Sequence, residues 1–387
     1  MNFFLGEEQL HWQSLACTFA QERVQPLARE MDEAGQMPHT LIEEMATRGF
    51  LGGTIPKAWG GSGMDALSLA LVYEELGRVC SSVRGFMTVH TSLVMQCINQ
   101  WGNDEQKQRY LPLMARGELI GCYALTEPDA GSDAASIQTT ARSEGGLGYA
   151  LNGEKIWITN GNIARIAIVF ARLHTLQEKK QHEQITAFLV PLNAAEDAGI
   201  KRTRMPGEPL GHRASDHAHI VFNDCFIGHE MVLGGEGMGF KVAMSALDHG
   251  RLGVAAGAVG VHQACLDACI QFAKERKQFG KPIGDFEMIQ STIAEMKASL
   301  DAARLLVYRS AWMKDQGLST KLETSIAKYF ATNAAVKAAS EAVLLHGARG
   351  YSNEYPVERY YRDIKGLQIY EGTEHIQKIV IAKELLR

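Results

Sequence analysis

The strongest constraint on the fold is a change in hydrophobic spacing that occurs twice along the chain. From Glu7 to about Gly121, apolar residues recur at intervals of three and four, which is the spacing of amphipathic helices. From about residue 122 to 233, short apolar runs such as 166–170 and 186–190 alternate with glycine and asparagine turn signals, which is typical of strands. After residue 239 the helical spacing returns and holds almost to the end of the chain.

This pattern predicts an α+β protein of three domains: a helical domain at 1–121, a middle β domain at 122–234, and a helical bundle at 235–387. We expect the middle domain to be a barrel or sandwich of antiparallel hairpins, with 174–184 as an exposed loop. The glycine-rich run at 234–239 lacks the full spacing and the βαβ context of a dinucleotide fingerprint. It is interpreted as a linker into a helix.

Composition argues against several classes of function. The formal net charge is −5, from 39 basic and 44 acidic side chains, so no cationic excess is present for nucleic acid or an anionic membrane surface. Apolar stretches are interrupted well before the roughly 20 residues that a membrane span needs. The first residues turn acidic at Glu7 before a signal sequence could form, so we expect a cytoplasmic protein.

The seven cysteines do not indicate a metal site. They are scattered, and none belongs to a C-x-x-C pair or lies near histidine at ligand spacing. Cys265 and Cys269 share one helix face, but no further soft ligand is near in sequence. We expect buried thiols and no metal. Signatures of a phosphate-binding loop, a serine nucleophile elbow and a zinc-protease helix are also missing from the sequence.

Two polar and aromatic segments stand out in the middle domain: 123–133 (YALTEPDAGSD) and 155–161 (KIWITNG). Hydroxyl groups and free backbone N–H groups around tight turns can bind the edge of a heteroaromatic ring, and Trp157 can cover its face. Either segment taken alone is better explained as a decorated hairpin turn.

Three further segments follow: 276–283 (RKQFGKPI), 354–363 (EYPVERYYRD) and 369–377 (IYEGTEHIQ). Together, in this order and spacing, the five segments resemble the acyl-CoA dehydrogenase family, flavoproteins that introduce an α,β double bond into acyl thioesters. The resemblance covers essentially the whole chain. It implies an FAD-dependent oxidoreductase acting on CH–CH donors, commonly a homotetramer built on the C-terminal helices.

The resemblance also implies which residues contact FAD. Segment 155–161 is expected to lie against the flavin ring, and segment 276–283 to reach the FAD of a neighbouring subunit, where Arg276 suits a pyrophosphate. The residues expected at the cofactor are Tyr123, Leu125, Thr126, Gly131, Ser132, Trp157, Ile158, Thr159, Arg276, Gln278, Phe279, Phe286, Leu344, Gly347, Ala348, Thr373 and His375.

Glu371 matches the family's catalytic base. A carboxylate there would remove the α-proton of the thioester while the β-hydrogen leaves as hydride to flavin N5. Some relatives carry the base on an earlier helix, at the position that is Gly250 here, which has no side chain. Substrate contacts are expected from Ser132, Asp248, Arg251 and Gly372, with a purely structural helix pair as the less favoured alternative for Asp248 and Arg251.

Some positions depart from the family pattern. Many relatives have glutamine and glycine where this chain has Leu344 and Ala348, and glutamine where it has Glu287, which puts adenosine contacts in doubt. The departures resemble a branch that oxidises small acyl groups on acyl carrier proteins in secondary metabolism. The segment 81–92 matches the helix that lines the acyl pocket in relatives, and its His90, Thr91 and Ser92 would make that pocket polar, or serve only for packing.

Three functions are therefore compared. The first is dehydrogenation of an acyl-CoA or acyl-carrier-protein thioester, with electrons passed to an electron-transfer flavoprotein or another acceptor, by a homotetramer or homodimer. The second is a flavin oxidase or monooxygenase on the same scaffold, and the third is a binding protein without chemistry. The last is disfavoured because the base and both ring-facing segments are present. The sequence does not define acyl length, carrier or acceptor.

Overall fold

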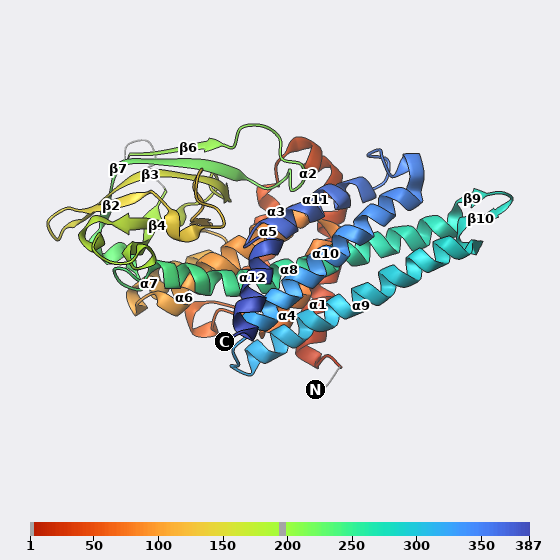
Figure 1. The fold of residues 1–387 in the computed structure, drawn as a ribbon, viewed down its shortest axis with the longest axis horizontal. Helices are drawn as coiled ribbons and strands as arrows, with labels where there is room; N and C mark the ends of the chain where they lie inside the picture. Colours follow the sequence, from red (N-terminus) through yellow and green to blue (C-terminus); the bar gives the residue numbers. More distant parts are fainter. Residues whose placement is uncertain (1–3, 193–198) are drawn as a thin grey trace.

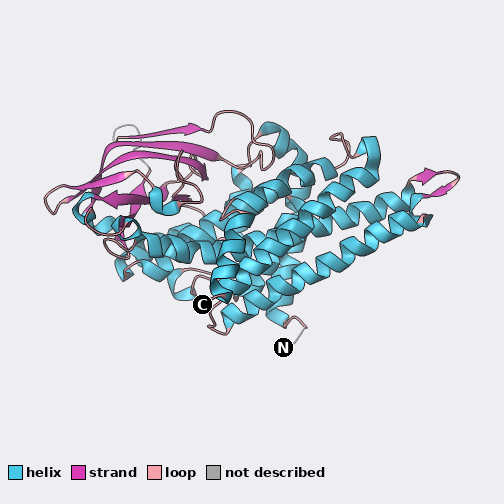
Figure 2. Cartoon of the chain, in the orientation of Figure 1, coloured by secondary structure: helices cyan, strands magenta, loops and turns pink. Residues whose placement is uncertain are grey.

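The computed structural model describes residues 4–192 and 199–387. It has three parts, which can be followed along the chain by the colours of Figure 1. A helical part comes first, a sheet follows, and a second set of helices completes the chain. The expected α+β architecture is confirmed. Figure 2 shows most strands gathered at one end of an elongated molecule and a small hairpin at the opposite end, which is the sheet of β9 and β10.

The first part is helical, as the spacing predicts. Its α-helices are α1 Glu7–Phe19, α2 Ala28–Ala34, α3 His39–Thr47, α4 Ala66–Val79, α5 Ser81–Met87, α6 Gln96–Trp101 and α7 Asp104–Ala115. A wider π-helical stretch, η4 Thr88–Met95, joins α5 to α6, so that Ser81 to Trp101 form one continuous helical run. This run carries the polar segment singled out in the sequence.

The middle part is a mixed sheet. Its strands are β1 Gly121–Ala124, β2 Thr140–Ser143, β3 Gly148–Thr159, β4 Ile166–Leu173, β5 Ile185–Pro191, β6 Ile200–Arg204, β7 His217–Gly228 and β8 Val232–Leu233. The spatial order is β6-β7-β3-β2-β4-β5-β8, with β1 paired to β4. The expectation of antiparallel hairpins alone is wrong, because β4 pairs in parallel with both β1 and β2.

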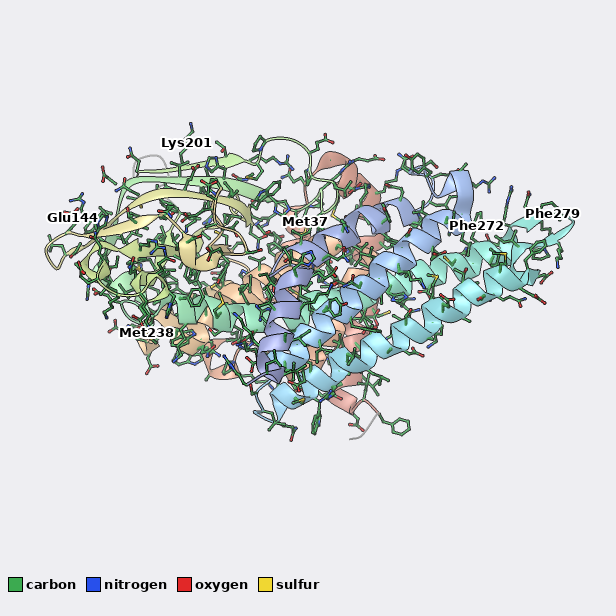
Figure 3. The ribbon with its side chains drawn as sticks, in the orientation of Figure 1. Met37, Glu144, Lys201, Met238, Phe272 and Phe279 are labelled. Carbon is green, nitrogen blue, oxygen red and sulfur yellow. The ribbon has the colours of Figure 1, made fainter. Side chains whose placement is uncertain are left out.

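The third part consists of long helices. They are α8 Gly239–Glu275, α9 Glu287–Asp315, α10 Lys321–His346, α11 Val357–Ile369 and α12 Glu374–Leu385. The glycine-rich run at 234–239 leads into α8, as expected of a linker. A hairpin of β9 Lys277–Gln278 and β10 Lys281–Pro282 joins α8 to α9 and projects from the end of the molecule, where Figure 3 labels Phe279.

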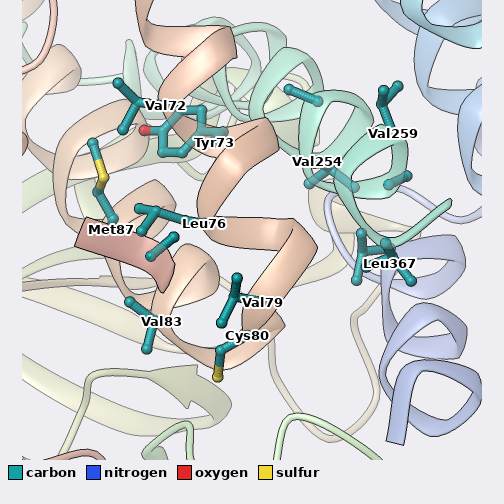
Figure 4. Close-up of a cluster of buried hydrophobic side chains, with 14 of the residues drawn as sticks. Val72, Tyr73, Leu76, Val79, Cys80, Val83, Met87, Val254, Val259 and Leu367 are labelled. Carbon is teal, nitrogen blue, oxygen red and sulfur yellow. The ribbon is translucent and has the colours of Figure 1, made fainter. Parts of the chain in front are cut away.

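Close packing between α4 and α8 explains the small residues of α8. A Cβ on Gly260 would lie 2.1 Å from the carbonyl oxygen of Glu74, so a larger residue would force the two helices apart. Around this contact the core is apolar, and Figure 4 shows Val72, Leu76 and Val254 among its side chains. A second core lies under the sheet and includes Phe170 and Phe188.

Helix α8 is central to the molecule. Within the described ranges, it alone is long and apolar enough to cross a membrane, but 78% of its most apolar window is buried inside the protein, as expected of a core helix. Six of the seven cysteines are buried, Cys17 is partly buried, and all are free thiols. No group of three or more His, Cys, Asp or Glu side chains that could hold a metal ion occurs in the parts of the chain described.

Candidate active site

Glu371 occupies the sharp turn between α11 and α12. Helix α11 ends at Ile369, and Glu371 then adopts a left-handed backbone with φ of 56°, followed by Gly372 with φ of 88°. Such a φ is costly for a residue with a side chain and is found where the surroundings impose it. The turn directs the carboxylate inward, and its Oε2 is buried without a hydrogen-bond partner. An unpartnered buried carboxylate oxygen is free to accept a proton from a ligand.

Gly250 of α8 provides the space for this carboxylate. A Cβ built on Gly250 would lie 1.9 Å from Glu371 Oε2 and 2.8 Å from a methyl carbon of Leu93. Both distances are far below van der Waals contact, so any side chain at position 250 would displace the carboxylate of Glu371 and the side chain of Leu93. Gly250 therefore has two consequences. It cannot act as a base, as the residue at this position does in some relatives, and it leaves the space that the carboxylate of Glu371 occupies.

Three cationic side chains from different helices surround Glu371. They are Lys328 on α10, Arg84 on α5 and Arg251 on α8, and each lowers the pKa of Glu371 by its charge. Burial has the larger effect and raises the pKa of Glu371 above its ordinary value. A carboxyl whose pKa is raised toward neutrality suits a general base at physiological pH.

Arg251 also forms the expected pair with Asp248. Its Nη1 donates to Asp248 Oδ1 at 2.8 Å, while its Nε is buried without a partner. Burial raises the pKa of Asp248, against the lowering effect of Arg251. Since Arg251 also acts on Glu371 by its charge, the Asp248–Arg251 pair lies near the base. Its geometry is compatible with a contact to substrate and with a purely structural role.

Arg84 is a buried cation that the motifs did not single out. Its Nη2 donates to the hydroxyl of Tyr370, and its Nη1 donates to Thr88 Oγ1 at 3.0 Å. The structure gives it no carboxylate partner within ion-pair distance among the described residues. Because Tyr370 precedes the base, Arg84 ties the turn of Glu371 to the polar helical run 81–101.

The polar segment 81–92 divides into structural and cavity-facing side chains. His90 Nε2 bonds the carbonyl of Met114, and its Nδ1 accepts from the N–H of Gly121, so this side chain links helix to sheet. Thr91 donates to the carbonyl of Leu51. Only Ser92 of the three faces a cavity, where it lies 2.7 Å from the hydroxyl of Tyr73.

That cavity is small, with a volume of about 30 Å³, and its lining mixes apolar and polar side chains. Its lining side chains come from the N-terminal helices, α8 and α9. They include Thr54, Leu69, Tyr73, Ser92, Gln96, His249, Leu252 and Lys314. Burial lowers the pKa of His249 to about 3, so it is neutral there at neutral pH. Gly253 lies on the same wall, one helical turn from Gly250.

The two segments expected at the flavin ring lie together. The N–H of Ile156 donates to the carbonyl of Thr126 at 3.0 Å, which holds the two turns side by side. Tyr123 donates to the carbonyl of Ala243 on α8. Burial raises the pKa of Tyr123, and the charges of Cys97 and Glu371 raise it further. Tyr123 is therefore near the base.

Trp157 is turned outward by an irregularity in β3. Its φ is 57°, the β3–β7 register shifts between Lys155 and Ile158, and the indole is 51% exposed. Trp157 and Tyr370 each pack edge-on against a histidine of the stretch before and within β7, His217 and His212 respectively. Thr159 also bonds His217, at 3.2 Å. Two histidines of one short stretch thus contact the exposed indole and the residue that precedes Glu371.

A buried ion pair that the motifs contain but sequence reasoning missed supports both segments. Lys155 Nζ lies 2.7 Å from Glu127 Oε1 and also donates to the carbonyl of Leu125. Glu127 in turn accepts from the N–H groups of Gln138 and Thr139. Both residues lie inside the two segments singled out in the sequence, Glu127 near Thr126 and Lys155 near Trp157. These two opposite charges were the sequence signal that could have predicted the ion pair.

The remaining expected residues on this side are less enclosed. Gly131 and Ser132 are exposed, and a Cβ on Gly131 would meet no atom within 4 Å, so this turn is open to a ligand. Leu125 and Ile158 are buried under the turn, and Thr373 caps α12 by accepting from the N–H of Ile376. His375 is exposed on α12.

A second group of expected residues lies away from Glu371, at the far end of the helices. Arg276, Gln278, Phe279 and Phe286 belong to the β9–β10 hairpin and its flanks, and Phe279 is 93% exposed at the tip (Figure 3). Leu344, Gly347 and Ala348 close α10 and are also exposed, Leu344 by 73%. Within one chain, this group is not brought together with Trp157.

This division fits FAD bound across two copies of the chain. Trp157, the open Gly131 turn and the Thr126 region present an aromatic face and hydrogen-bonding groups, as a flavin ring requires. Phe279 and Leu344 expose large apolar surfaces that a single chain leaves uncovered. Arg276, at the base of the same hairpin as Phe279, is a cation of the kind that binds a pyrophosphate.

Comparison with known proteins matches all three parts of the chain. Family models described as the N-terminal, middle and C-terminal domains of acyl-CoA dehydrogenase match residues 6–118, 122–225 and 237–386. The chain is 39% identical over 389 residues to the short-chain specific acyl-CoA dehydrogenase of Clostridium acetobutylicum, with all of both chains covered.

Two solved structures extend the comparison. A chain in the structure of the electron transferring flavoprotein of Acidaminococcus fermentans, described in terms of flavin-based electron bifurcation, superimposes with a TM-score of 0.96 at 39% identity, covering 100% of both chains. The prolyl acyl carrier protein oxidase AnaB superimposes with a TM-score of 0.92 at 32% identity, covering 99% of this chain and 100% of AnaB.

Proposed function

The chain belongs to the acyl-CoA dehydrogenase family, and we propose that Glu371 is the base with which it dehydrogenates acyl thioesters. The enzyme is an FAD-dependent oxidoreductase that acts on the CH–CH bond of an acyl-CoA. The observation that carries the assignment of the base is the inward carboxylate of Glu371, whose Oε2 is buried and unpartnered.

The residues around Glu371 account for the proton transfer. The carboxylate removes the α-proton of the thioester at Oε2, and the space over Gly250 lets it approach a substrate held against α8. Burial strengthens it as a base, and the charges of Lys328, Arg84 and Arg251 keep a useful fraction ionised. When bound, FAD accepts the hydrogen and the electron pair that leave the β-carbon.

The test replaces the carboxylate by an amide of nearly the same volume. Glu371→Gln, mixed anaerobically with butyryl-CoA, should keep its FAD and bind the thioester but lose flavin bleaching by roughly 10²–10⁴-fold, since an amide cannot accept the proton. Glu374→Gln, three residues later and ion-paired with Lys378 on α12, is the matched control and should bleach at the parent rate. Near-parental bleaching in Glu371→Gln would place the base elsewhere.

A small polar acyl group is a second candidate substrate, carried on CoA or on an acyl carrier protein. The cavity of about 30 Å³ supports it, because it is small and because Tyr73, Ser92 and Gln96 add polar atoms to a wall that also contains Leu69 and Leu252. AnaB, a relative by structure, acts on a carrier-protein substrate according to its name. Bleaching by the same short acyl group on CoA and on a carrier protein separates the two carriers.

We further infer an electron-transfer flavoprotein as acceptor and a homo-oligomer, tetramer or dimer, as the working unit. The acceptor is supported by the likeness to the chain from the Acidaminococcus structure. The oligomer is supported by the exposed Phe279 and Leu344, which lie with Arg276 away from Trp157 of the same chain. An oxidase or monooxygenase would instead reoxidise with oxygen at the same rate whether or not the flavoprotein is added.

A further inference from the structure

Two buried side chains bind the backbone of the turn that carries Glu371. Lys328 Nζ donates to the carbonyl of Tyr370 at 2.6 Å and to the carbonyl of Gly372. Gln377 Nε2 donates to the carbonyl of Gly372 at 2.8 Å and to that of Glu371 at 3.3 Å. The carbonyls on both sides of the base, and its own, are therefore all held by side chains.

The position of Lys328 is unusual for a lysine. Its side chain is 1% exposed in the middle of α10, and Gln377 is 0% exposed on α12. Lysine is rarely buried unless it is paired, since desolvating an ammonium is costly. Within the described ranges Lys328 has no carboxylate within ion-pair distance, and Glu371 is the largest source of favourable charge for it.

The backbone of this turn needs such support. Glu371 and Gly372 both have positive φ, and the first of them has a side chain that disfavours that conformation. A single ammonium that bonds the carbonyls of Tyr370 and Gly372 holds the peptide planes that precede Glu371 and follow Gly372. The direction of the carboxylate, toward the space over Gly250, follows from that geometry.

Charge connects the two groups as well. Burial lowers the pKa of Lys328 and raises that of Glu371, while each of the two opposes the change in the other. The titratable and charged groups that face Glu371 from the surrounding elements are Tyr73 on α4, Arg84 on α5, Tyr123 on β1, Arg251 on α8, Lys328 on α10, and Tyr370 beside it. Lys328 is the first of the cations in its effect on Glu371.

We propose that Lys328 is a positioning residue for the reaction: it holds the left-handed turn of Glu371 through two carbonyls and favours the ionised carboxylate by its charge, with Gln377 supporting the turn alone. This inference rests on the proposed role of Glu371. Comparing the two residues separates the effect of holding the turn from the effect of charge, because Gln377 bonds the same turn without carrying a charge.

The experiment compares Lys328→Met, Gln377→Met and Lys328→Arg by the rate of anaerobic flavin bleaching with butyryl-CoA across pH. Lys328→Met should lose about 10-fold or more at neutral pH, and the limb where the rate rises with pH should move upward by about one unit, because loss of the cation raises the pKa of Glu371. Gln377→Met should lower the rate without moving that limb. Lys328→Arg should leave the limb near its parental position.

Amide hydrogen exchange gives a readout that does not depend on turnover. Exchange in the peptide covering residues 370–377 should be faster in Lys328→Met and Gln377→Met than in the parent. Lys337→Met, on the same helix but exposed and ion-paired with Glu295, is the control and should change neither measurement. Thioester affinity should stay within about threefold of the parent in every variant.

The outcomes separate this inference from the proposed function. A parental pH profile and parental exchange in Lys328→Met would overturn the role of Lys328 and leave Glu371 as the base. An equal upward shift of the limb in Lys328→Met and Lys328→Arg would overturn the charge effect. If Lys328→Met does not fold, the Arg and Gln377 variants still decide the matter. A parental rate in Glu371→Gln would instead remove the proposed function itself.

Discussion

Gly250 and Glu371 occupy one space: a Cβ on Gly250 would lie 1.9 Å from Oε2 of the glutamate and 2.6 Å from its carboxyl carbon. Real Cβ atoms do not approach other atoms this closely, so any side chain at 250 must displace the carboxylate. The two positions are 121 residues apart in the sequence, on α8 and on the α11–α12 turn. Because glycine has no Cβ at position 250, the carboxylate of Glu371 can occupy the space that a side chain on α8 would otherwise fill.

Gly250→Ala should therefore impair catalysis without removing the base. Displacing the carboxylate by about 1 Å costs on the order of 100-fold in rate, so anaerobic bleaching by butyryl-CoA should slow by that factor while bound FAD stays at the parental ratio. Gly85→Ala is the control, since a Cβ on that helical glycine would meet nothing closer than 3.8 Å. An unimpaired Gly250→Ala enzyme would show that Glu371 reacts from another position.

Arg276→Ala should reduce the FAD content and weaken the assembly together. Arg276 lies at the base of the exposed β9–β10 hairpin, away from Trp157 of its own chain, so its loss acts on the cofactor only through a neighbouring copy. The measurements are the ratio of flavin to protein and the elution volume at several concentrations. Lys274→Ala, an exposed residue on the same helix end, should change neither. Full FAD retention in Arg276→Ala would place the pyrophosphate elsewhere.

The order of the three parts could be predicted because hydrophobic period is a local property of the sequence. The register of the sheet could not, because β1 and β2 pair in parallel with β4 across intervening segments that carry no pairing signal. The polar stretch 81–92 shows the same limit. Sequence spacing places His90, Thr91 and Ser92 on one helix, but only the fold sends the first two to backbone carbonyls and Ser92 to a cavity.

Site residues that lie inside a sequence motif could be predicted. Residues on another helix that support those motif residues could not. Glu371 and the segments around Thr126 and Trp157 follow from the resemblance, whereas Lys328 stands on α10 with nothing in its neighbouring residues to mark it. Lys328 comes near Glu371 only in the folded chain, because the two are 43 residues apart in the sequence. The roles of the individual residues at FAD and substrate stay predictions, as do the cytoplasmic location and the number of subunits.

Lys155→Met should destabilise the middle domain and loosen the flavin-facing turns. It would leave the Glu127 carboxylate buried without its cation, which typically costs about 3–5 kcal/mol. Because Lys155 also holds the carbonyl of Leu125, FAD retention should fall as well. Denaturant unfolding and flavin content measure the two effects. The double variant with Glu127→Gln should recover much of the stability, and equal loss in single and double variants would contradict the ion-pair explanation.

His90 should make the folded protein sensitive to acid. Burial lowers the pKa of His90 to about 4, from an ordinary value near 6.5, so the folded state binds fewer protons than the unfolded state between these values. Its contribution to stability is therefore complete above about pH 6.5 and is lost as pH falls toward 4. Between pH 7.5 and 5, this amounts to about 2 kcal/mol in the free energy of unfolding.

The test compares that pH dependence in the parent and in His90→Asn, which keeps a neutral polar side chain near Met114 and Gly121. The variant should be less stable at pH 7.5, where it loses the fitted bonds, but its stability should fall less on acidification, by about 2 kcal/mol. The other buried histidines, His212, His262 and His346, also have lowered pKa values and remain in both proteins, so they cancel in the difference. Identical slopes would show that protonation of His90 does not cause the loss of stability at low pH.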